Sequence, residues 1–148
     1  MDAKKHDIFM NVAIEEAKLS LSEGGIPVGA VLVKNDKILG KGHNRRLQDG
    51  NPIGHAEIIC LRNAGRLVDY HNATLYSTLM PCYLCAGAVV QFKIKKVVVG
   101  EAQNFTGAED FMKQHGVRVI NLNLFKCKNM MKKFINENPD IWKEDIGN

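Results

Sequence analysis

The sequence predicts an α/β protein in which one sheet is covered by helices on both faces. Helical and strand-like segments alternate along the chain, and no repeat, low-complexity tract or linker interrupts their order. The chain has 148 residues, 45% of them hydrophobic and 24% charged, which is ordinary for a globular protein that buries a core without disulfides. We therefore expect one domain, spanning residues 1–148.

The first half of the chain begins with a helix, a hairpin and a second helix. Apolar residues in the first segment recur with a spacing near 3.6, which indicates an amphipathic helix, and a Gly-Gly pair ends it. Two short apolar runs then flank an Asn-Asp turn, which is the pattern of a β-hairpin. The loop NPIG precedes the next helical pattern. The expected bounds are helix 5–22, strands 28–33 and 38–40 around turn 34–37, and helix 55–66.

The second half alternates strands with helices as far as a proline near the C-terminus. Short apolar runs rich in valine predict buried strands, and a longer periodic segment predicts the last helix. Asn138-Pro139 breaks that helix and leaves a separate tail at 139–148. The expected bounds are strand 74–79, a helix that opens at Cys82 and continues through 86–92, strand 97–99, helix 110–115, strand 117–122 and helix 124–135.

Two cysteines in the segment MPCYLC lie at the start of a predicted helix. Pro81 suits a first helical turn, and Cys82 and Cys85 share one face because they are three residues apart. The positive end of the helix dipole lowers the pKa of a thiol and favours the thiolate. The pattern alone leaves three interpretations open: zinc ligands, a redox dithiol of the thioredoxin type, or core cysteines.

The segment GHAEIICL favours zinc. A redox dithiol needs neither His55 nor Glu57, whereas a zinc hydrolase needs a third ligand and a carboxylate that is not a ligand. Side chains two positions apart point about 200° apart on an ideal helix, so these two converge only if His55 has non-helical geometry at the helix mouth. We predict one zinc ion per chain, bound by His55, Cys82 and Cys85, with the fourth position left for a water molecule. Zinc lowers the pKa of such a water from 15.7 to about 7. Glu57 is the predicted proton shuttle.

Other histidines and cysteines compete weakly for these roles. His43 follows a strand and could approach the site, whereas Cys60 falls on the apolar side of its helix and is expected in the core. Surface-like contexts surround His6, His71 and His115.

Charge and hydropathy indicate a soluble protein. The net charge is +4, and the basic pairs are scattered, which predicts a solvated surface rather than a nucleic-acid footprint. The N-terminal segment lacks a signal-peptide core, and no apolar run approaches the ~18 residues of a membrane span. We expect a cytoplasmic protein with neither a membrane nor a nucleic acid as partner.

Two motifs carry a resemblance to a known family. HAE at 55–57 and PCYLC at 81–85 match the HxE and PCxxC signature of the zinc-dependent nucleobase deaminases. The chain also resembles the fungal-type cytosine deaminases along nearly its whole length. Matching stretches are EEA near 15, EGGIPVGA at 23–30, GKGHNRR at 40–46, TLYSTLMPC at 74–82, VVVGE at 97–101, NFTG at 104–107 and WKEDIGN at 142–148. Relatives that act on tRNA adenosine share the two motifs but usually end in a basic helix, whereas this chain ends acidic and aromatic.

The resemblance implies a three-layer α/β/α sandwich with a mixed five-stranded sheet, and usually a homodimer. The apolar segments AGAVVQF and MNVAIEEA also favour a partner chain. The implied reaction is hydrolytic deamination of a free nucleobase, with cytosine the first choice. Residues 139–148 would form a lid. The implied base contacts are hydrogen bonds from Asn44 and Asp145, packing by Phe105 and Trp142, and a pocket border at Ala56.

Two departures from the fungal pattern leave the preferred base open. Met80 stands where the fungal enzymes carry serine, and Ala56 replaces their glycine. Guanine or another small amino-heterocycle, and then adenosine in tRNA, are alternative substrates. Outside this class the alternatives are a dithiol oxidoreductase and a zinc-stabilised binding module, although Glu57 argues against an inactive site.

Overall fold

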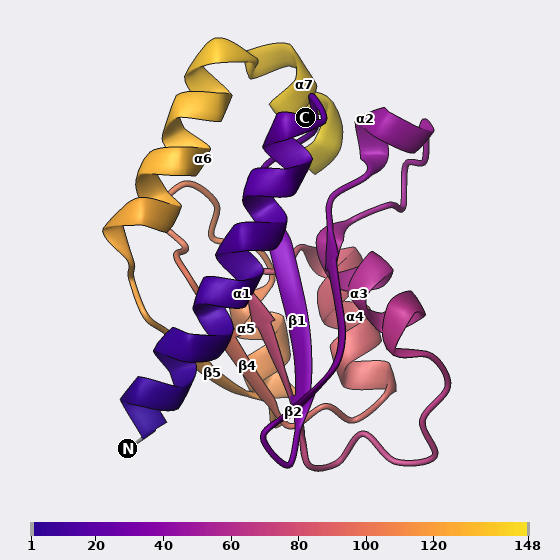
Figure 1. Ribbon diagram of the computed structural model, residues 1–148. Helices are drawn as coiled ribbons and strands as arrows, with labels where there is room; N and C mark the ends of the chain where they lie inside the picture. Colours follow the sequence, from indigo (N-terminus) through magenta and orange to yellow (C-terminus); the bar gives the residue numbers. More distant parts are fainter. Residues whose placement is uncertain (1, 148) are drawn as a thin grey trace.

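The computed structural model describes residues 2–147 as a sheet between two layers of helices (Figure 1). Met1 and Asn148, the ends of the predicted domain and of the predicted lid, lie outside the described residues. The strands are β1 (Gly29–Lys34), β2 (Lys37–His43), β3 (Ala73–Ser77), β4 (Lys96–Val99) and β5 (Arg118–Asn121). The helices are α1 (Asp2–Ser22), α2 (Arg46–Asp49), α3 (Ala56–Ala64), α4 (Tyr83–Gln91), α5 (Glu109–Gln114), α6 (Phe125–Glu137) and α7 (Pro139–Ile146).

The sheet has five strands, as predicted, and their order is β2-β1-β3-β4-β5. β1 runs antiparallel to both β2 and β3, whereas β3, β4 and β5 are parallel, so the sheet is mixed. The hairpin between β1 and β2 turns at Asn35 and Asp36, whose φ angles of 53° and 61° lie in the left-handed region that Asn and Asp tolerate. The predicted Asn-Asp turn is confirmed.

Two apolar clusters hold the layers together, one on each face of the sheet. On one face, Met10 and Ile14 of α1 pack against Val31 and Val98. On the other, α3, α4 and α5 pack against a second cluster that includes Leu75. Figure 1 shows α1 and α6 in front of the sheet and α3, α4 and α5 behind it. Strands covered on both faces are short apolar runs, which explains why their sequences lack alternation.

One edge of the sheet gathers the segments that carry the sequence motifs. Because β1 is antiparallel to both β2 and β3, the ends of β2, β3 and β4 lie at the same edge, where β1 begins. Asn44 follows β2, Leu79 and Met80 follow β3, and the loop with Phe105 follows β4. In sheets of this kind ligands bind beyond the carboxyl ends of the strands, so the topology points to this edge.

Three sequence expectations need correction. The short helix α2 was not expected, and the tail after Asn138, for which no element was predicted, forms the helix α7. His6 is not at the surface: it is buried, and its Nδ1 lies 2.8 Å from the Tyr76 hydroxyl across the α1–β3 contact. His71 and His115 are exposed and Cys60 is buried, as predicted. Within residues 2–147, every helix is too short or too polar to cross a bilayer.

Candidate active site

His55 and Glu57 converge because the helix begins between them. His55 is the N-cap of α3 and has extended geometry, with φ −72° and ψ 152°. Ala56 is the first helical residue, and Glu57 lies in the first turn with only 4% of its surface exposed. The predicted non-helical geometry of the histidine at the helix mouth is confirmed.

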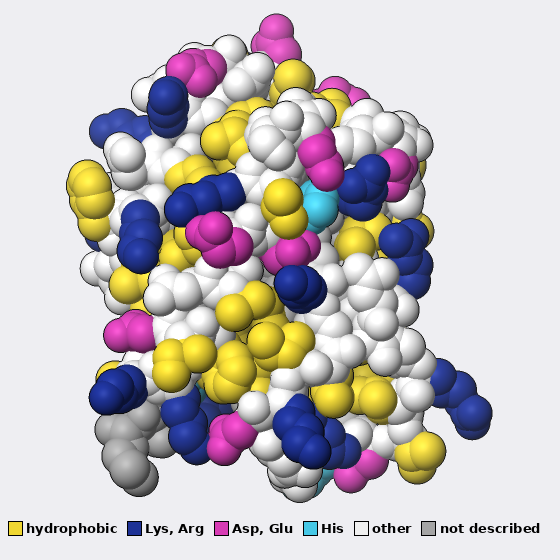
Figure 2. Space-filling model, viewed as in Figure 1, with side chains coloured by type: hydrophobic (Ala, Val, Ile, Leu, Met, Phe, Trp, Pro, Cys, Tyr) yellow, Lys and Arg dark blue, Asp and Glu magenta, His cyan; other side chains and the backbone are white. Residues whose placement is uncertain are grey.

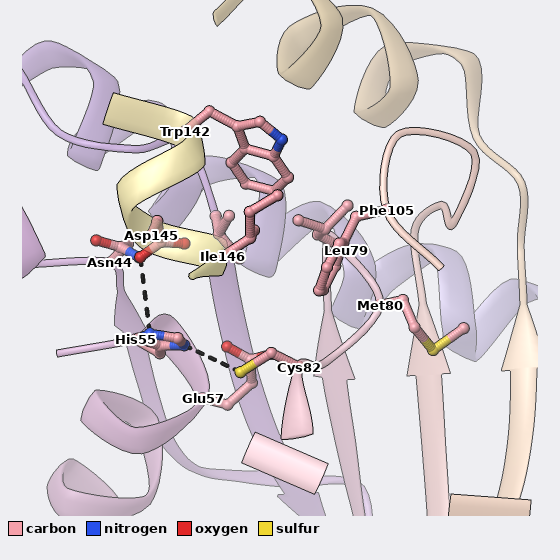
Figure 3. A pocket seen from close by; sticks show the side chains of 11 residues that line it. Asn44, His55, Glu57, Leu79, Met80, Cys82, Phe105, Trp142, Asp145 and Ile146 are labelled. Carbon is pink, nitrogen blue, oxygen red and sulfur yellow. Dashed lines mark hydrogen bonds and ion pairs between the residues drawn. The ribbon is translucent and has the colours of Figure 1, made fainter. Parts of the chain in front are cut away.

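Cys82 and Cys85 reach the same point from the opposite side. Cys82 is the extended N-cap of α4, and Cys85 lies in its first turn. His55 Nδ1 is 3.3 Å from Cys82 Sγ and 3.6 Å from Cys85 Sγ (Figure 3), and all three donor atoms lie within 4.8 Å of one another. Two thiols and one imidazole are ligands that zinc prefers, and three protein ligands leave a coordination position open. Among residues 2–147 this is the one such group of donors.

The local electrostatics favour a thiolate at Cys82, a thiol at Cys85 and a carboxyl at Glu57 that can carry a proton near neutrality. A hydrogen bond from Cys85 lowers the pKa of Cys82 to about 4, with burial opposing and His55 adding to the shift. The same hydrogen bond, with burial, raises the pKa of Cys85. Burial opposes charge on His55, but Cys82, Glu57 and Asp145 together raise its pKa to about 9. Burial, then the charge of Cys82, raises the pKa of Glu57 to about 7, a value suited to taking and giving a proton near neutrality.

Asn44 and Asp145 form the polar end of the cavity beside this cluster (Figure 3). Asn44 is 2% exposed, and its Oδ1 accepts a hydrogen bond of 2.9 Å from the backbone N–H of Arg46. Burial raises the pKa of Asp145. Its buried Oδ1 makes no hydrogen bond to any residue that the structure describes, and lies 3.6 Å from His55 Nε2. An unpaired buried acceptor is costly, so this oxygen is suited to a ligand's N–H.

Apolar side chains wall the rest of the cavity. Phe105 and Trp142 meet edge to face, with ring centroids 5.7 Å apart. Met80 also lines the cavity, but in Figure 3 its side chain runs away from His55 and Glu57. It packs beside Gly107, where an added Cβ would lie 2.9 Å from Met80 Cγ. Met80 therefore narrows the space near the metal donors less than the sequence suggested.

Two sequence candidates stay outside the cavity lining. Ala56 is fully buried in the apolar core, so its side chain does not border the pocket. His43 does not enter the site, because its ring nitrogens each lie 2.9 Å from a carboxylate oxygen, one of Glu16 and one of Glu23.

Three lining residues were missed by sequence reasoning: Val28, Leu79 and Ile146. Each lies within a matched stretch: Val28 in EGGIPVGA just before β1, Leu79 in TLYSTLMPC and Ile146 in WKEDIGN. Apolar residues at these positions carry no chemical signature, and only the fold brings them together.

Comparisons with known proteins agree with this geometry. The cytidine and deoxycytidylate deaminase zinc-binding region matches residues 3–101. The chain is 47% identical over 141 residues to a cytosine deaminase of Candida albicans, covering 93% of this chain and 94% of that protein. It is 36% identical over 141 residues to a tRNA-specific adenosine deaminase of Buchnera aphidicola subsp. Schizaphis graminum, covering 93% and 90%. A solved tRNA:A34 deaminase shares the fold with a TM-score of 0.73 and 27% identity, over 84% of this chain and 99% of that one. The chain belongs to the cytidine and deoxycytidylate deaminase family, and the matched zinc-binding region contains His55, Cys82 and Cys85.

Proposed function

We propose that the protein hydrolyses free cytosine to uracil and ammonia. One observation carries this proposal. Glu57 is a buried carboxyl beside three metal donors, and the cavity next to it ends in the polar side chains of Asn44 and Asp145. The high identity to the cytosine deaminase of Candida albicans over nearly its full length supports the same substrate. Such a reaction would serve the salvage of pyrimidine bases in the cytoplasm, where thiol ligands stay reduced.

In this proposal Glu57 moves the proton. Zinc, when bound by His55, Cys82 and Cys85, lowers the pKa of a water ligand from 15.7 to about 7. Glu57 takes a proton from the attacking water and delivers it to the leaving amino nitrogen. A C–O bond forms at the ring carbon as its C–N bond breaks, so water and cytosine leave as uracil and ammonia.

Asn44 and Asp145 then recognise the opposite edge of the ring. The sequence suggested that Asn44 both donates and accepts. Its Oδ1 accepts a hydrogen bond from the Arg46 N–H and keeps a second lone pair, and Nδ2 is the group that we expect to donate to the base. Asp145 offers the complementary acceptor. One donor beside one acceptor suits the adjacent carbonyl and ring N–H of a pyrimidinone. A base with the reverse pattern would leave buried groups unpaired, at about 1–3 kcal/mol each.

A closed cavity favours a free base over a polynucleotide. Trp142, Asp145 and Ile146 of α7 line the cavity and cover it as the proposed lid (Figure 3). Basic and acidic side chains are interspersed on the face shown in Figure 2, without a continuous basic stripe. Nucleic acids are bound mainly through such basic surfaces, so we do not expect tRNA as the substrate.

A substrate panel tests the proposal. Ammonia release from cytosine, cytidine, guanine and an adenosine-containing anticodon stem-loop should be measured side by side, with the zinc content matched. We expect cytosine to be the best substrate by at least about tenfold, from one unpaired buried group in each competitor. Faster turnover of the nucleoside or the stem-loop would refute a closed free-base site. A preference for guanine would agree with a closed free-base site but would refute cytosine as the preferred base.

The metal assignment predicts the effect of Cys82→Ser. The purified protein should hold about one zinc per chain, and the variant should lose it and unfold at a lower temperature, because metal binding is coupled to folding. Cys127→Ser is a matched control, since Cys127 is buried on α6 outside this cluster. Elemental analysis and thermal unfolding measure both effects. Zinc-free wild-type protein whose thiols cycle to a disulfide would support the dithiol oxidoreductase instead.

We also propose that the protein is a homodimer. Tyr83, Leu84 and Phe92 project from α4 and are exposed, as is Ile53 in the loop before α3, which supports an apolar contact with a partner. The segment MNVAIEEA gives no such support, because its apolar side chains pack on the sheet of the same chain. Sedimentation should give about twice 16.5 kDa. A monomer at micromolar concentration would contradict the dimer.

A further inference from the structure

Arg46 joins three segments that surround the cavity. Its side chain leaves the start of α2, and Nη1 donates a hydrogen bond of 3.0 Å to the Pro52 carbonyl in the loop before α3. Nη2 donates to Glu144 Oε1 of α7 at 3.3 Å, and Nε lies 3.9 Å from Asp145 Oδ1. The side chains of Arg46 and Asp145 are 17% and 9% exposed, so their ion pair is shielded from solvent, whereas Glu144 is 61% exposed and its ion pair is shielded on the Arg46 side only.

The backbone of the same residue fixes the other polar side chain of the site. The Arg46 N–H is the donor that occupies Asn44 Oδ1 at 2.9 Å. Arg46 therefore contacts Asn44 through its main chain and Asp145 through its guanidinium. A displacement of Arg46 would disturb both polar groups at once.

α7 is the element expected to move when a base enters, because Trp142, Asp145 and Ile146 line one side of the cavity. Asn44, Glu57, Met80 and Trp142 are all buried, although each lines the cavity. α7 has eight residues and follows α6 through Asn138 alone, so it can swing about that junction. Its attachments across the cavity are the packing of Trp142 on Phe105, the 3.6 Å approach of Asp145 Oδ1 to His55 Nε2, and the contacts with Arg46.

We propose that Arg46 is a positioning residue that holds α7 closed over the cavity and aligns Asp145 with Asn44. The planar guanidinium suits this task, because it hydrogen-bonds the Pro52 carbonyl and the Glu144 carboxylate while its Nε lies within ion-pair distance of Asp145. The part played in catalysis rests on the proposed function, whereas the closure of α7 does not depend on which substrate the site accepts.

Trp142 makes the closure directly measurable, because it is the only tryptophan of the chain and lies on α7. In the Arg46→Gln variant we expect acrylamide to quench the fluorescence of Trp142 more strongly than in the wild type. The fraction of molecules with α7 open should rise about two- to fivefold, because partly exposed ion pairs typically contribute that much to an equilibrium. Circular dichroism and zinc content should stay unchanged. Glu144→Gln should shift quenching in the same direction by less, and the double variant should match Arg46→Gln alone, because both remove the same contact.

Arg45→Gln is the matched control. Arg45 precedes Arg46 and also carries one charge, but it pairs with Asp49 and Glu23 and makes no hydrogen bond or ion pair with the described residues of α7. Its loss should leave Trp142 quenching at the wild-type value. Equal quenching in wild type, Arg46→Gln and Glu144→Gln would overturn the proposal. An equal rise in Arg45→Gln and Arg46→Gln would overturn it too, because net charge rather than a specific contact would then be responsible.

Kinetics distinguish this role from a merely structural one. If Arg46 aligns the closed state, Arg46→Gln raises the KM for the base by about the factor seen in quenching, and kcat changes by less than about twofold. A parallel loss of kcat with unchanged KM would argue against alignment of the bound base. If quenching rises in Arg46→Gln but the wild-type protein does not deaminate cytosine, the proposed closure of α7 would stand and cytosine would be refuted as the substrate.

Discussion

Zinc-loaded protein carrying Glu57→Gln is expected to lose turnover by about 10²–10⁴-fold, the usual contribution of a general acid–base group. The amide has nearly the same shape as the carboxyl, so it fills the same buried place in the first turn of α3. It cannot take a proton from water and pass it to the leaving nitrogen. Because Glu57 is not one of the three donors, the zinc content should not change.

Glu15→Gln is the control for this substitution. Glu15 is exposed on α1 and pairs only with Lys18 in a surface ion pair, so the same chemical change there should leave turnover intact. Ammonia release and elemental analysis are the two measurements. If Glu57→Gln lost its zinc, Glu57 would be a ligand and the assignment of roles would be wrong.

Short sequence patterns made the metal donors and Glu57 predictable. A histidine just before a helix, a carboxylate in its first turn and a cysteine pair at the mouth of another helix are local patterns. Each depends on the geometry of helix starts, which short sequence signals set. The hairpin and the short buried strands followed from periodicity and turn residues in the same way, whereas the mixed sheet was implied by the family resemblance.

The other half of the site depends on contacts between distant segments. α7 is only eight residues long, too short to be stable alone, and burial of Trp142 against Phe105 supports it. His6 was expected at the surface because nothing near it in sequence indicates Tyr76 as its partner. Composition and periodicity likewise cannot reveal the hydrogen bond from the Arg46 N–H that orients the Asn44 side chain.

Truncation after Asn138 is expected to abolish base turnover while zinc stays bound. The truncated chain lacks Trp142, Asp145 and Ile146, so the cavity loses its cover and its acceptor for the ring N–H. None of these is a metal donor. Asn138 itself remains, and its Nδ2 still bonds the Phe134 carbonyl at the end of α6. Zinc analysis and ammonia release from cytosine measure the two predicted effects.

Stability has to be separated from recognition in that experiment. Removing a buried tryptophan typically costs about 3–5 kcal/mol, so the truncated chain should unfold at a lower temperature than the full chain. Asp145→Asn supplies the matched variant, because it keeps the size of the side chain and the cover by Trp142 but removes the charge. We expect this variant to fold with normal zinc content and to lose cytosine turnover by roughly tenfold or more, since a charged acceptor contributes about 1.5–3 kcal/mol to a hydrogen bond. A truncated protein that deaminates cytosine at nearly the wild-type rate would show that α7 neither covers nor recognises the base.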